Sequence, residues 1–262
     1  MTDYARTVVA GIRSLLAYVS VAVYVLVVAP PGILVAILFR WPNVLYWLGR
    51  GGVRLGLGTV GITCRATGLE HVQLDRSAVY CVNHTSNIEP PILYLVLCAL
   101  HPRLNILYKA ELRKAIPVLR RAFDVIGFVP IERGSRERSM RSIDAAAASL
   151  RSGESFLIFP EGTRSRTGKL LPFKKGGFIM ALKGEAAIVP VAIQGAAAAM
   201  KKGSPIIRPV QVSVRIGLPI ETAERTVESR DALVSETRTA IERLLDQGLL
   251  TSGRDATSGQ SG

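Results

Sequence analysis

A long uncharged segment near the N-terminus is the feature that most constrains what this chain can fold into. Residues 14–39 contain no charged side chain, and a helix of this length and composition can span a bilayer. The pair Pro30-Pro31 and the following Gly32 interrupt the segment. Because proline lacks a backbone donor and clashes with the preceding helical turn, we expect these prolines to end a helix. They would separate two arms, residues 14–29 and residues 33–47.

Both ends of this segment carry positive charge. The basic residues are Arg6 and Arg13 before it and Arg40, Arg50 and Arg54 after it. Lys and Arg are enriched on the cytoplasmic side of membrane segments, so basic flanks at both ends indicate a hairpin that enters one leaflet and returns. We therefore expect residues 1–55 to form a membrane-associated helical hairpin on the cytoplasmic face of the inner or plasma membrane. A true span is the alternative, and a cleaved signal peptide is disfavoured because the apolar run is too long.

The charge of the whole chain indicates an anionic partner. Its 262 residues carry a formal net charge of +13, and a net +9 of this lies within residues 101–180. Nucleic acid is disfavoured, because basic residues interleaved with aromatic ones and a nucleic-acid-reading motif are both missing from the sequence. Membrane lipid or a phosphate-bearing substrate fits better. The three cysteines have neither metal-ligand spacing nor the even number of a disulfide framework, so no metal site is expected.

After the hairpin, short apolar runs alternate with helical patterns. Six runs are typical of buried strands: residues 78–82, 105–108, 125–131, 155–159, 188–193 and 210–216. Helical patterns cover residues 90–100, 139–151 and 231–245. The alternation predicts an α/β domain over residues 56–250, with a largely parallel mixed sheet flanked by helices. We interpret the glycine-rich residues 49–61 as the turn out of the hairpin and residues 251–262 as a disordered tail.

A histidine and a carboxylate lie five positions apart where the first of these runs ends. His84 and Glu89 stand in the run Asn83-His84-Thr85-Ser86-Asn87-Ile88-Glu89. A neutral imidazole can take a proton from a hydroxyl, and a nearby carboxylate can orient the ring and stabilise the imidazolium. Cys81 raises the alternative of a thiol nucleophile. It lies inside the apolar run, where a cysteine is usually a small buried hydrophobe.

Three further segments follow in order. They are Gly127-Phe128-Val129-Pro130-Ile131-Glu132-Arg133, Phe159-Pro160-Glu161-Gly162-Thr163-Arg164-Ser165 and Val189-Pro190-Val191-Ala192-Ile193. Two accessory segments lie between the motifs, Lys109-Ala110-Glu111-Leu112 and Phe173-Lys174-Lys175-Gly176-Gly177-Phe178. The second and third motifs each end a strand-like run near an arginine. Guanidinium groups can grip two phosphate oxygens at once.

Together these motifs, from about residue 83 to residue 193, resemble the glycerolipid acyltransferase family typified by the 1-acylglycerol-3-phosphate (lysophosphatidic acid) acyltransferases. The resemblance implies a glycerol-3-phosphate acyltransferase-like α/β fold, and some members of the family carry an N-terminal two-helix membrane motif. The chain departs from the family at one position. The family usually has His-x4-Asp, whereas Glu89 supplies the acid here. The extra methylene still permits a carboxylate–imidazole hydrogen bond, with some adjustment of rotamer or backbone.

The resemblance also implies the reaction. A fatty acyl group would pass from an acyl thioester, carried by coenzyme A or acyl carrier protein, to the free hydroxyl of 1-acylglycerol 3-phosphate, giving phosphatidic acid without a cofactor. His84 would be the base and Glu89 the orienting acid. The expected substrate-binding residues are Lys109, Arg133, Glu161, Gly162, Thr163 and Arg164. Glu161 would orient Arg164 or a substrate hydroxyl, and Asn83 or backbone N–H groups near the turn would stabilise the oxyanion.

Direct transfer is the expected route, because the sequence has no Gly-x-Ser-x-Gly elbow for a covalent acyl-enzyme. Two other functions stay open. The chain could acylate another lysolipid or glycerol 3-phosphate, although Arg133 and Arg164 favour an anionic acceptor. It could instead be a non-catalytic membrane protein that binds anionic lipid through its basic body.

Overall fold

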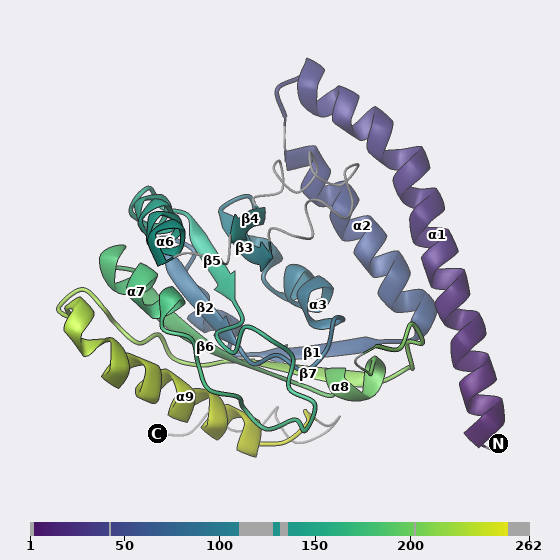
Figure 1. Ribbon diagram of the computed structural model, residues 1–262. Coiled ribbons are helices and arrows are strands. Elements are labelled where there is room, and N and C mark those ends of the chain that lie inside the picture. The colour runs from purple at the N-terminus through teal and green to yellow at the C-terminus, as the bar shows by residue number, and fades with distance from the viewer. Residues whose placement is uncertain (1–2, 42, 110–127, 132–135, 202, 251–262) are drawn as a thin grey trace, which may run out of the picture.

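The computed structural model describes residues 3–41, 43–109, 128–131, 136–201 and 203–250 (Figure 1). Their core is one seven-stranded sheet with the order β1-β7-β6-β2-β5-β3-β4. The strands are β1 (Thr63–Thr67), β2 (Ala78–Val82), β3 (Leu104–Lys109), β4 (Phe128–Ile131), β5 (Ser155–Ile158), β6 (Ala187–Gln194) and β7 (Gln211–Ile216). All neighbouring strands run parallel except β6 and β7, which are antiparallel. The predicted α/β fold with a largely parallel mixed sheet is confirmed.

Helices surround the sheet and extend beyond it. They are α1 (Asp3–Leu38), α2 (Asn43–Val60), α3 (Glu89–Val96), α6 (Arg136–Arg151), α7 (Gly176–Lys183), α8 (Ala196–Ala199) and α9 (Arg230–Asp246). Short 3-10 turns form η1 (Leu69–His71), η2 (Cys98–Leu100) and η3 (Val227–Ser229). Helices α6, α7 and α9 lie on the side of the sheet away from α2 and α3 (Figure 1).

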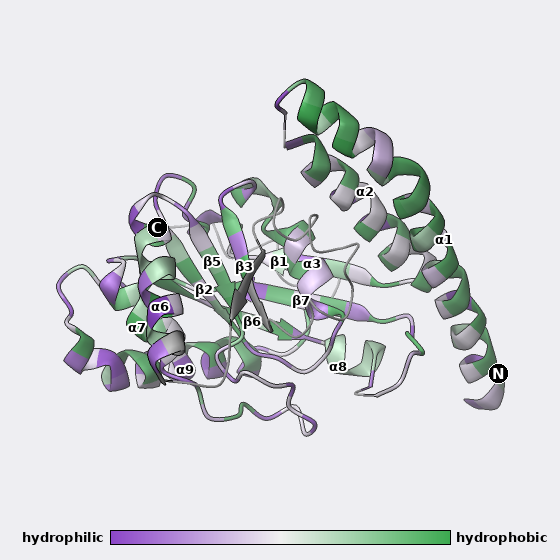
Figure 2. Ribbon diagram, turned by 45° about the horizontal axis from the view of Figure 1, so that its top comes forward, coloured by the Kyte–Doolittle hydropathy of each residue, from purple (hydrophilic) through white to green (hydrophobic). Residues whose placement is uncertain are grey.

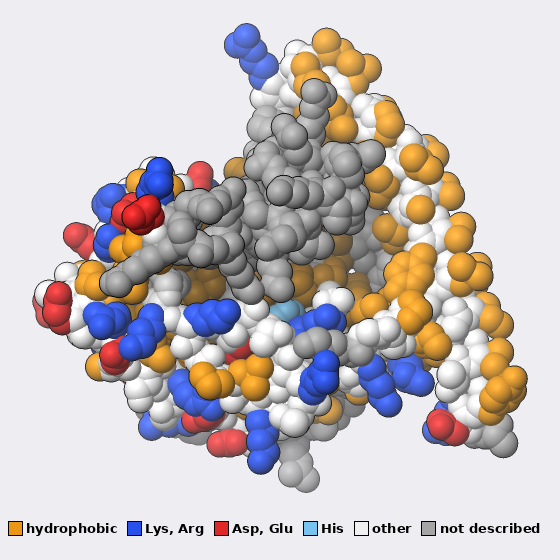
Figure 3. Space-filling view, in the orientation of Figure 1, with side chains coloured by type: hydrophobic (Ala, Val, Ile, Leu, Met, Phe, Trp, Pro, Cys, Tyr) orange, Lys and Arg blue, Asp and Glu red, His pale blue; other side chains and the backbone are white. Residues whose placement is uncertain are grey.

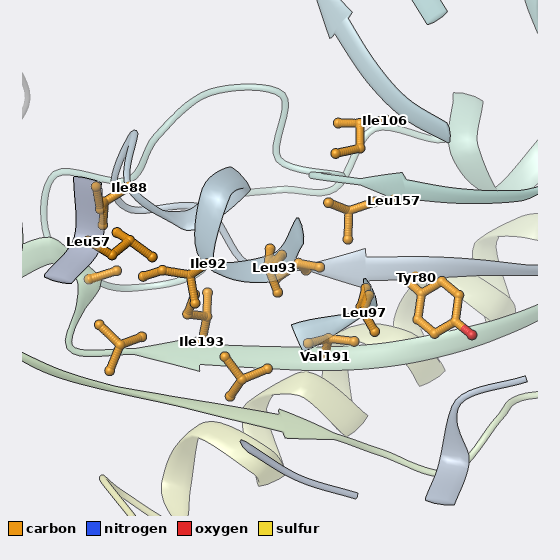
Figure 4. Packing of buried hydrophobic residues seen from close by; sticks show 14 of the residues in the cluster. Leu57, Tyr80, Ile88, Ile92, Leu93, Leu97, Ile106, Leu157, Val191 and Ile193 are labelled. Carbon is orange, nitrogen blue, oxygen red and sulfur yellow. The ribbon is translucent and has the colours of Figure 1, made fainter. Parts of the chain in front are cut away.

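The central strands are buried on both faces, which is why their sequences read as continuous apolar runs. In β2, Tyr80 points into a cluster with Leu93 of α3, and its neighbour Val79 points into a cluster with Phe178 of α7. The two faces alternate because successive side chains of a strand point in opposite directions. Figure 4 shows the first cluster, in which residues of α3 pack between strand residues such as Leu157 and Val191. Parallel pairing therefore brings the carboxyl ends of β2, β3, β5 and β6 to one edge of the sheet.

The two N-terminal helices end and begin at other residues than the sequence predicts. Helix α1 continues through Pro30 and Pro31 to Leu38, so the prediction that these prolines end the helix is wrong. Two prolines remove only two backbone hydrogen bonds, and packing against α2 outweighs this loss. The connection to α2 lies after Leu38, about two turns beyond the prolines.

The glycine-rich residues 49–61 form most of α2, so their interpretation as a turn is also wrong. A Cβ on Gly51 would lie 2.5 Å from the Tyr24 hydroxyl of α1, and a Cβ on Gly52 would lie 3.1 Å from the same ring. On α1, a Cβ on Gly32 would lie 2.2 Å from Leu48 Cδ1. Small residues let two helices approach closely, and that packing is the role of these glycines.

The outer surface of α1 is apolar and exposed, as the mainly hydrophobic colouring of this helix in Figures 2 and 3 shows. Leu26 is 74% exposed and Val27 is 65% exposed. Within the described residues, α1 is the one helix long and apolar enough to cross a membrane, and 6% of its most apolar stretch is buried. A surface of this kind is suited to contact with lipid rather than water.

The six predicted strands are present, and their described ends differ from the prediction by at most one residue. Residues 125–127 of the third predicted strand lie outside the described part. The periodicity of the sequence did not predict β1, an edge strand whose residues 63–65 are exposed, or the short helices α7 and α8. The three predicted helices correspond to α3 with η2, α6 and α9. The predicted disordered tail, residues 251–262, lies outside the described residues.

Candidate active site

His84 and Glu89 form a close pair at the carboxyl edge of the sheet. Strand β2 ends at Val82 and α3 begins at Glu89. His84 therefore lies in the short loop between them, and Glu89 is the first residue of the helix that follows. Nδ1 of His84 lies 2.6 Å from Oε2 of Glu89. The Glu89 side chain is completely buried, whereas the His84 side chain is 17% exposed. The acid is therefore sheltered from solvent, and the imidazole reaches the surface of the site.

Glu89 is held by a set of donors from the loop that it closes. Oε1 accepts the Thr85 N–H at 2.9 Å, the Thr85 hydroxyl at 2.6 Å and the Ser86 N–H at 3.0 Å. A buried carboxylate is costly unless such donors surround it, and these bonds stabilise its ionised form. An ionised Glu89 requires a proton on Nδ1 of His84, which leaves Nε2 as the acceptor nitrogen. In the part of the chain that the structure describes, no residue hydrogen-bonds to Nε2.

A second glutamate fixes the backbone of His84. Oε1 of Glu161 accepts the His84 N–H at 2.8 Å, and Oε2 accepts the Leu171 N–H at 2.8 Å. The Ser165 N–H donates to the His84 carbonyl at 2.8 Å, and the Phe159 ring stacks on the imidazole at 4.1 Å. Burial raises the pKa of Glu161 above its ordinary value. Both carboxylate oxygens of Glu161 thus accept hydrogen bonds from backbone N–H groups. The sequence had suggested that Glu161 would orient Arg164 or a substrate hydroxyl.

The expected oxyanion donors near the turn are already engaged. The Asn83 side chain exchanges two hydrogen bonds with the backbone of Ile193, at 3.0 and 2.7 Å. The N–H groups of His84, Thr85 and Ser86 all donate to the two buried glutamates. These donors therefore already have partners within the protein, and the source of oxyanion stabilisation stays a prediction. Asn83 connects the end of β2 to β6. The motif at residues 189–193 is therefore a structural neighbour of the site.

The loop after β5 presents the cationic part of the site. Gly162 has φ +67, a backbone conformation that favours glycine. A Cβ on this residue would lie 2.8 Å from Cε of Lys174, so glycine leaves room for the lysine side chain to pack against the backbone here. Thr163 is exposed and Arg164 is half-buried. Arg164 makes no ion pair with any carboxylate of the described ranges, whereas Lys175 pairs with Asp231 at 2.8 Å. Lys and Arg side chains gather on this face of the body (Figure 3).

The remaining predicted cations belong to neighbouring strands. Lys109 is the last residue of β3, which pairs in parallel with β5, so its backbone lies at the same edge of the sheet. Its side chain lies outside the described part of the structure. Arg133 also lies outside the described residues, two positions after β4 ends. Among the residues that are described, no group of three or more His, Cys, Asp or Glu could hold a metal ion.

The buried position of Cys81 argues against a thiol nucleophile. Its side chain is 0% exposed and belongs to the cluster on the α7 face of the sheet. Burial raises the pKa of the thiol, which disfavours the reactive thiolate.

Sequence reasoning missed the roles of Thr85, Ser86 and Phe159. The spacing Ser86-x-x-Glu89 carried a signal, because a glutamate three residues after a serine commonly reaches back to its N–H at a helix start.

Known proteins are similar to this chain in sequence and in fold. A family model described as Acyltransferase matches residues 63–194. The 1-acyl-sn-glycerol-3-phosphate acyltransferase of Limnanthes douglasii is 30% identical over 224 residues, which cover 83% of this chain and 77% of that protein. A protein of the same name from Cocos nucifera is 31% identical over 188 residues, covering 70% of this chain and 59% of that protein.

A solved structure matches the fold over nearly the whole chain. The crystal structure of the 1-acyl-sn-glycerophosphate acyltransferase PlsC from Thermotoga maritima superposes with a TM-score of 0.78. The superposition covers 93% of this chain and 98% of that one, at 22% sequence identity. From the family match and the sequence identity to the plant proteins, this chain belongs to the acyltransferase family that includes the 1-acyl-sn-glycerol-3-phosphate acyltransferases.

Proposed function

We propose that this chain transfers a fatty acyl group from an acyl thioester to the free hydroxyl of 1-acylglycerol 3-phosphate, giving phosphatidic acid. The observation that carries the proposal is the 2.6 Å contact between His84 Nδ1 and a fully buried Glu89, with Nε2 left for a substrate. The printed names of the relatives support the choice of acceptor.

In this mechanism the acceptor oxygen attacks the thioester carbonyl carbon while Nε2 of His84 takes the hydroxyl proton. Glu89 accepts the hydrogen bond from Nδ1–H and stabilises the imidazolium that forms. The tetrahedral intermediate then collapses with cleavage of the C–S bond, and the imidazolium returns its proton to the leaving thiolate. The products are the new ester and a free thiol. Glu161 acts as a positioning residue that keeps the His84 backbone in place.

The acceptor phosphate would be held by Arg164, with Lys109 and Arg133 from the neighbouring strand ends. Arg164 supports this assignment because it is half-buried beside the catalytic loop and makes no ion pair with a described carboxylate. The donor would be acyl-coenzyme A or acyl carrier protein. The basic excess of the chain would attract either of these acidic carriers.

The hairpin would place this chemistry at the membrane surface. Helices α1 and α2 would enter one leaflet from the cytoplasmic face, with the apolar outer surface of α1 in contact with lipid. The acceptor and the product would then exchange directly with the same leaflet. The exposed apolar side chains of α1 support this arrangement.

Substitution of the proposed base tests the reaction. His84→Ala should lower kcat by about 10²- to 10⁴-fold, the usual contribution of a general base, and should leave binding to anionic vesicles nearly unchanged. His71→Gln is the matched control, because His71 lies against the Ile216 carbonyl in a different part of the body. Mass spectrometry of the products with a panel of acyl thioesters and acceptors provides the measurement.

The same panel decides the acceptor. A preference for 1-acylglycerol 3-phosphate over neutral monoacylglycerol would support the proposal. If the wild-type protein consumes no thioester with any acceptor and still binds anionic vesicles, the chain is a lipid-binding protein and the proposed function is wrong.

A further inference from the structure

A pocket of about 140 Å³ lies between the first half of α2 and the end of α3, apart from the active site. The side chains that matter for its chemistry are Tyr46, Trp47, Arg50, Tyr94, Cys98 and His101. Helix α3 starts at Glu89 in the active site, and the pocket touches its far half and the turn that follows. The pocket is larger than the roughly 30 Å³ that one water molecule occupies in the liquid.

Three buried nitrogen atoms around this pocket have no hydrogen-bond partner. They are Nε of Arg50 and both ring nitrogens of His101. Within the described residues, these are all the buried side-chain nitrogen or oxygen atoms that lack a partner. Buried polar groups are nearly always paired with protein or with a bound molecule, and leaving one unpaired is costly. Because all three atoms belong to residues that line one pocket, they indicate a polar occupant.

The charge of the lining indicates an anion. Arg50 is permanently charged, and no Asp or Glu is among the described residues that line the pocket. The His101 ring is fixed between Tyr46 and Tyr94, with ring centroids 4.6 and 4.5 Å away. Burial lowers the pKa of His101 to about 4, against a smaller opposing contribution from the Tyr94 backbone, so at neutral pH one ring nitrogen is a donor and the other an acceptor. Arg50 Nε–H and one imidazole N–H can therefore bind the same anion.

The position of the pocket indicates where the anion comes from. Trp47 forms one wall, lies 5.5 Å below the Arg50 guanidinium and is 59% exposed. Trp41, just before α2, is 51% exposed. Tryptophan is enriched at the membrane–water boundary, where lipid phosphates also lie. The neighbouring helix α1 carries the exposed apolar surface.

We propose that this pocket binds the phosphate of a membrane phospholipid, with Arg50 and His101 as hydrogen-bond donors. The bound lipid is separate from the acyl acceptor, and the proposal does not depend on the proposed reaction. Because Arg50 belongs to α2 and His101 directly follows η2, the phosphate would connect the hairpin to the segment that begins with α3 at Glu89.

Native mass spectrometry of the full-length protein in detergent tests this site with three probes. Phosphatidylglycerol carries both tails and phosphate, diacylglycerol carries the tails alone, and inorganic phosphate carries the anion alone. The variants are Arg50→Gln and His101→Phe, and the control is Arg54→Gln. Arg54 is exposed one turn further along α2. His101→Phe keeps a ring between Tyr46 and Tyr94 and decides the outcome if Arg50→Gln fails to fold.

We expect wild type and Arg54→Gln to bind phosphatidylglycerol with equal affinity, and Arg50→Gln and His101→Phe to bind it at least about tenfold more weakly. Diacylglycerol binding should be the same in all four proteins. Equal phosphatidylglycerol affinity in wild type and both pocket variants would overturn the site. Inorganic phosphate that binds as tightly as phosphatidylglycerol, and depends on Arg50, would overturn the assignment to a lipid.

Discussion

At the scale of single residues, two buried glutamates determine where His84, the proposed base, lies. Glu89 binds the imidazole and the N–H groups of Thr85 and Ser86, and Glu161 binds the His84 N–H from the other side of the loop. The loop thereby satisfies its backbone donors with carboxylates instead of water. This satisfaction explains how a polar loop can be buried at the edge of the sheet. It also orients the proposed base before a substrate arrives.

Two substitutions of Glu89 separate its charge from its reach. Glu89→Gln keeps the side-chain length but loses the charge that stabilises the imidazolium, so we expect kcat to fall by about 10²-fold or more. Glu89→Asp restores the carboxylate usual in the family but shortens it by one methylene. Since the backbone here is fitted to the 2.6 Å glutamate contact, we expect activity between those of wild type and Glu89→Gln. Steady-state kinetics measure both, and a Glu89→Gln enzyme with wild-type kcat would exclude stabilisation of the imidazolium by the Glu89 charge.

At the scale of elements, the hairpin has two surfaces that differ in the residue types they contain. The surface between α1 and α2 is made of glycines that fit under larger side chains, as Gly51 and Gly52 fit under Tyr24. The outer surface of α1 is made of exposed apolar side chains. Helix α1 therefore packs on one side through close approach of the backbones, and its other side is apolar and exposed.

Charges on the outer surface of α1 should weaken membrane association. The double variant Val23→Asp and Leu26→Asp places two carboxylates on exposed positions, each costing about 2.5–3.5 kcal/mol if it lies at the bilayer centre. We expect a larger soluble fraction after centrifugation of membranes, with an unchanged Tm because neither side chain is buried. Leu218→Asp is the control, since Leu218 is 71% exposed on the loop after β7. Equal pelleting of wild type and double variant would argue against insertion of α1.

At the scale of the whole molecule, one sheet joins the candidate site to the two N-terminal helices. The parallel strands β2, β5 and β3 end at the edge that holds the site, and α2 and α3 pack together on one face of that sheet. His101 lies in this region, at the pocket between α2 and α3. Its burial therefore links the stability of the whole fold to pH.

The stability of the protein should fall as the pH decreases from about 6.5 towards 4. Burial lowers the pKa of His101 from 6.5 to about 4, so in this window the unfolded chain binds a proton that the folded protein does not. His101→Phe removes this difference. We expect the Tm of wild type, relative to the variant, to be constant above about pH 7 and to decline below pH 6.5. Parallel Tm curves for the two proteins from pH 7 to pH 4 would show that His101 is not held neutral by burial.

The pattern of residues alone was sufficient for the strands of the core, the strand-to-loop position of His84 and its spacing from Glu89. These features are local, because they depend on the period of a strand and on residues five positions apart. Local rules failed at Pro30 and Pro31, where helix packing outweighed the preference of proline to end a helix. They also misplaced the glycines of α2, whose role depends on a second helix.

The tertiary structure decided the contacts between residues far apart in the chain. Glu161 binds the His84 N–H across 77 positions, and Asn83 binds Ile193 across 110 positions. The pocket of Arg50 and His101 likewise needs α2 and α3 to meet. No short-range pattern reports such pairs, because strand order and helix packing determine which distant residues become neighbours. The sequence by itself thus determined which reactive and charged side chains are present. The fold decided which of these side chains form hydrogen bonds with one another.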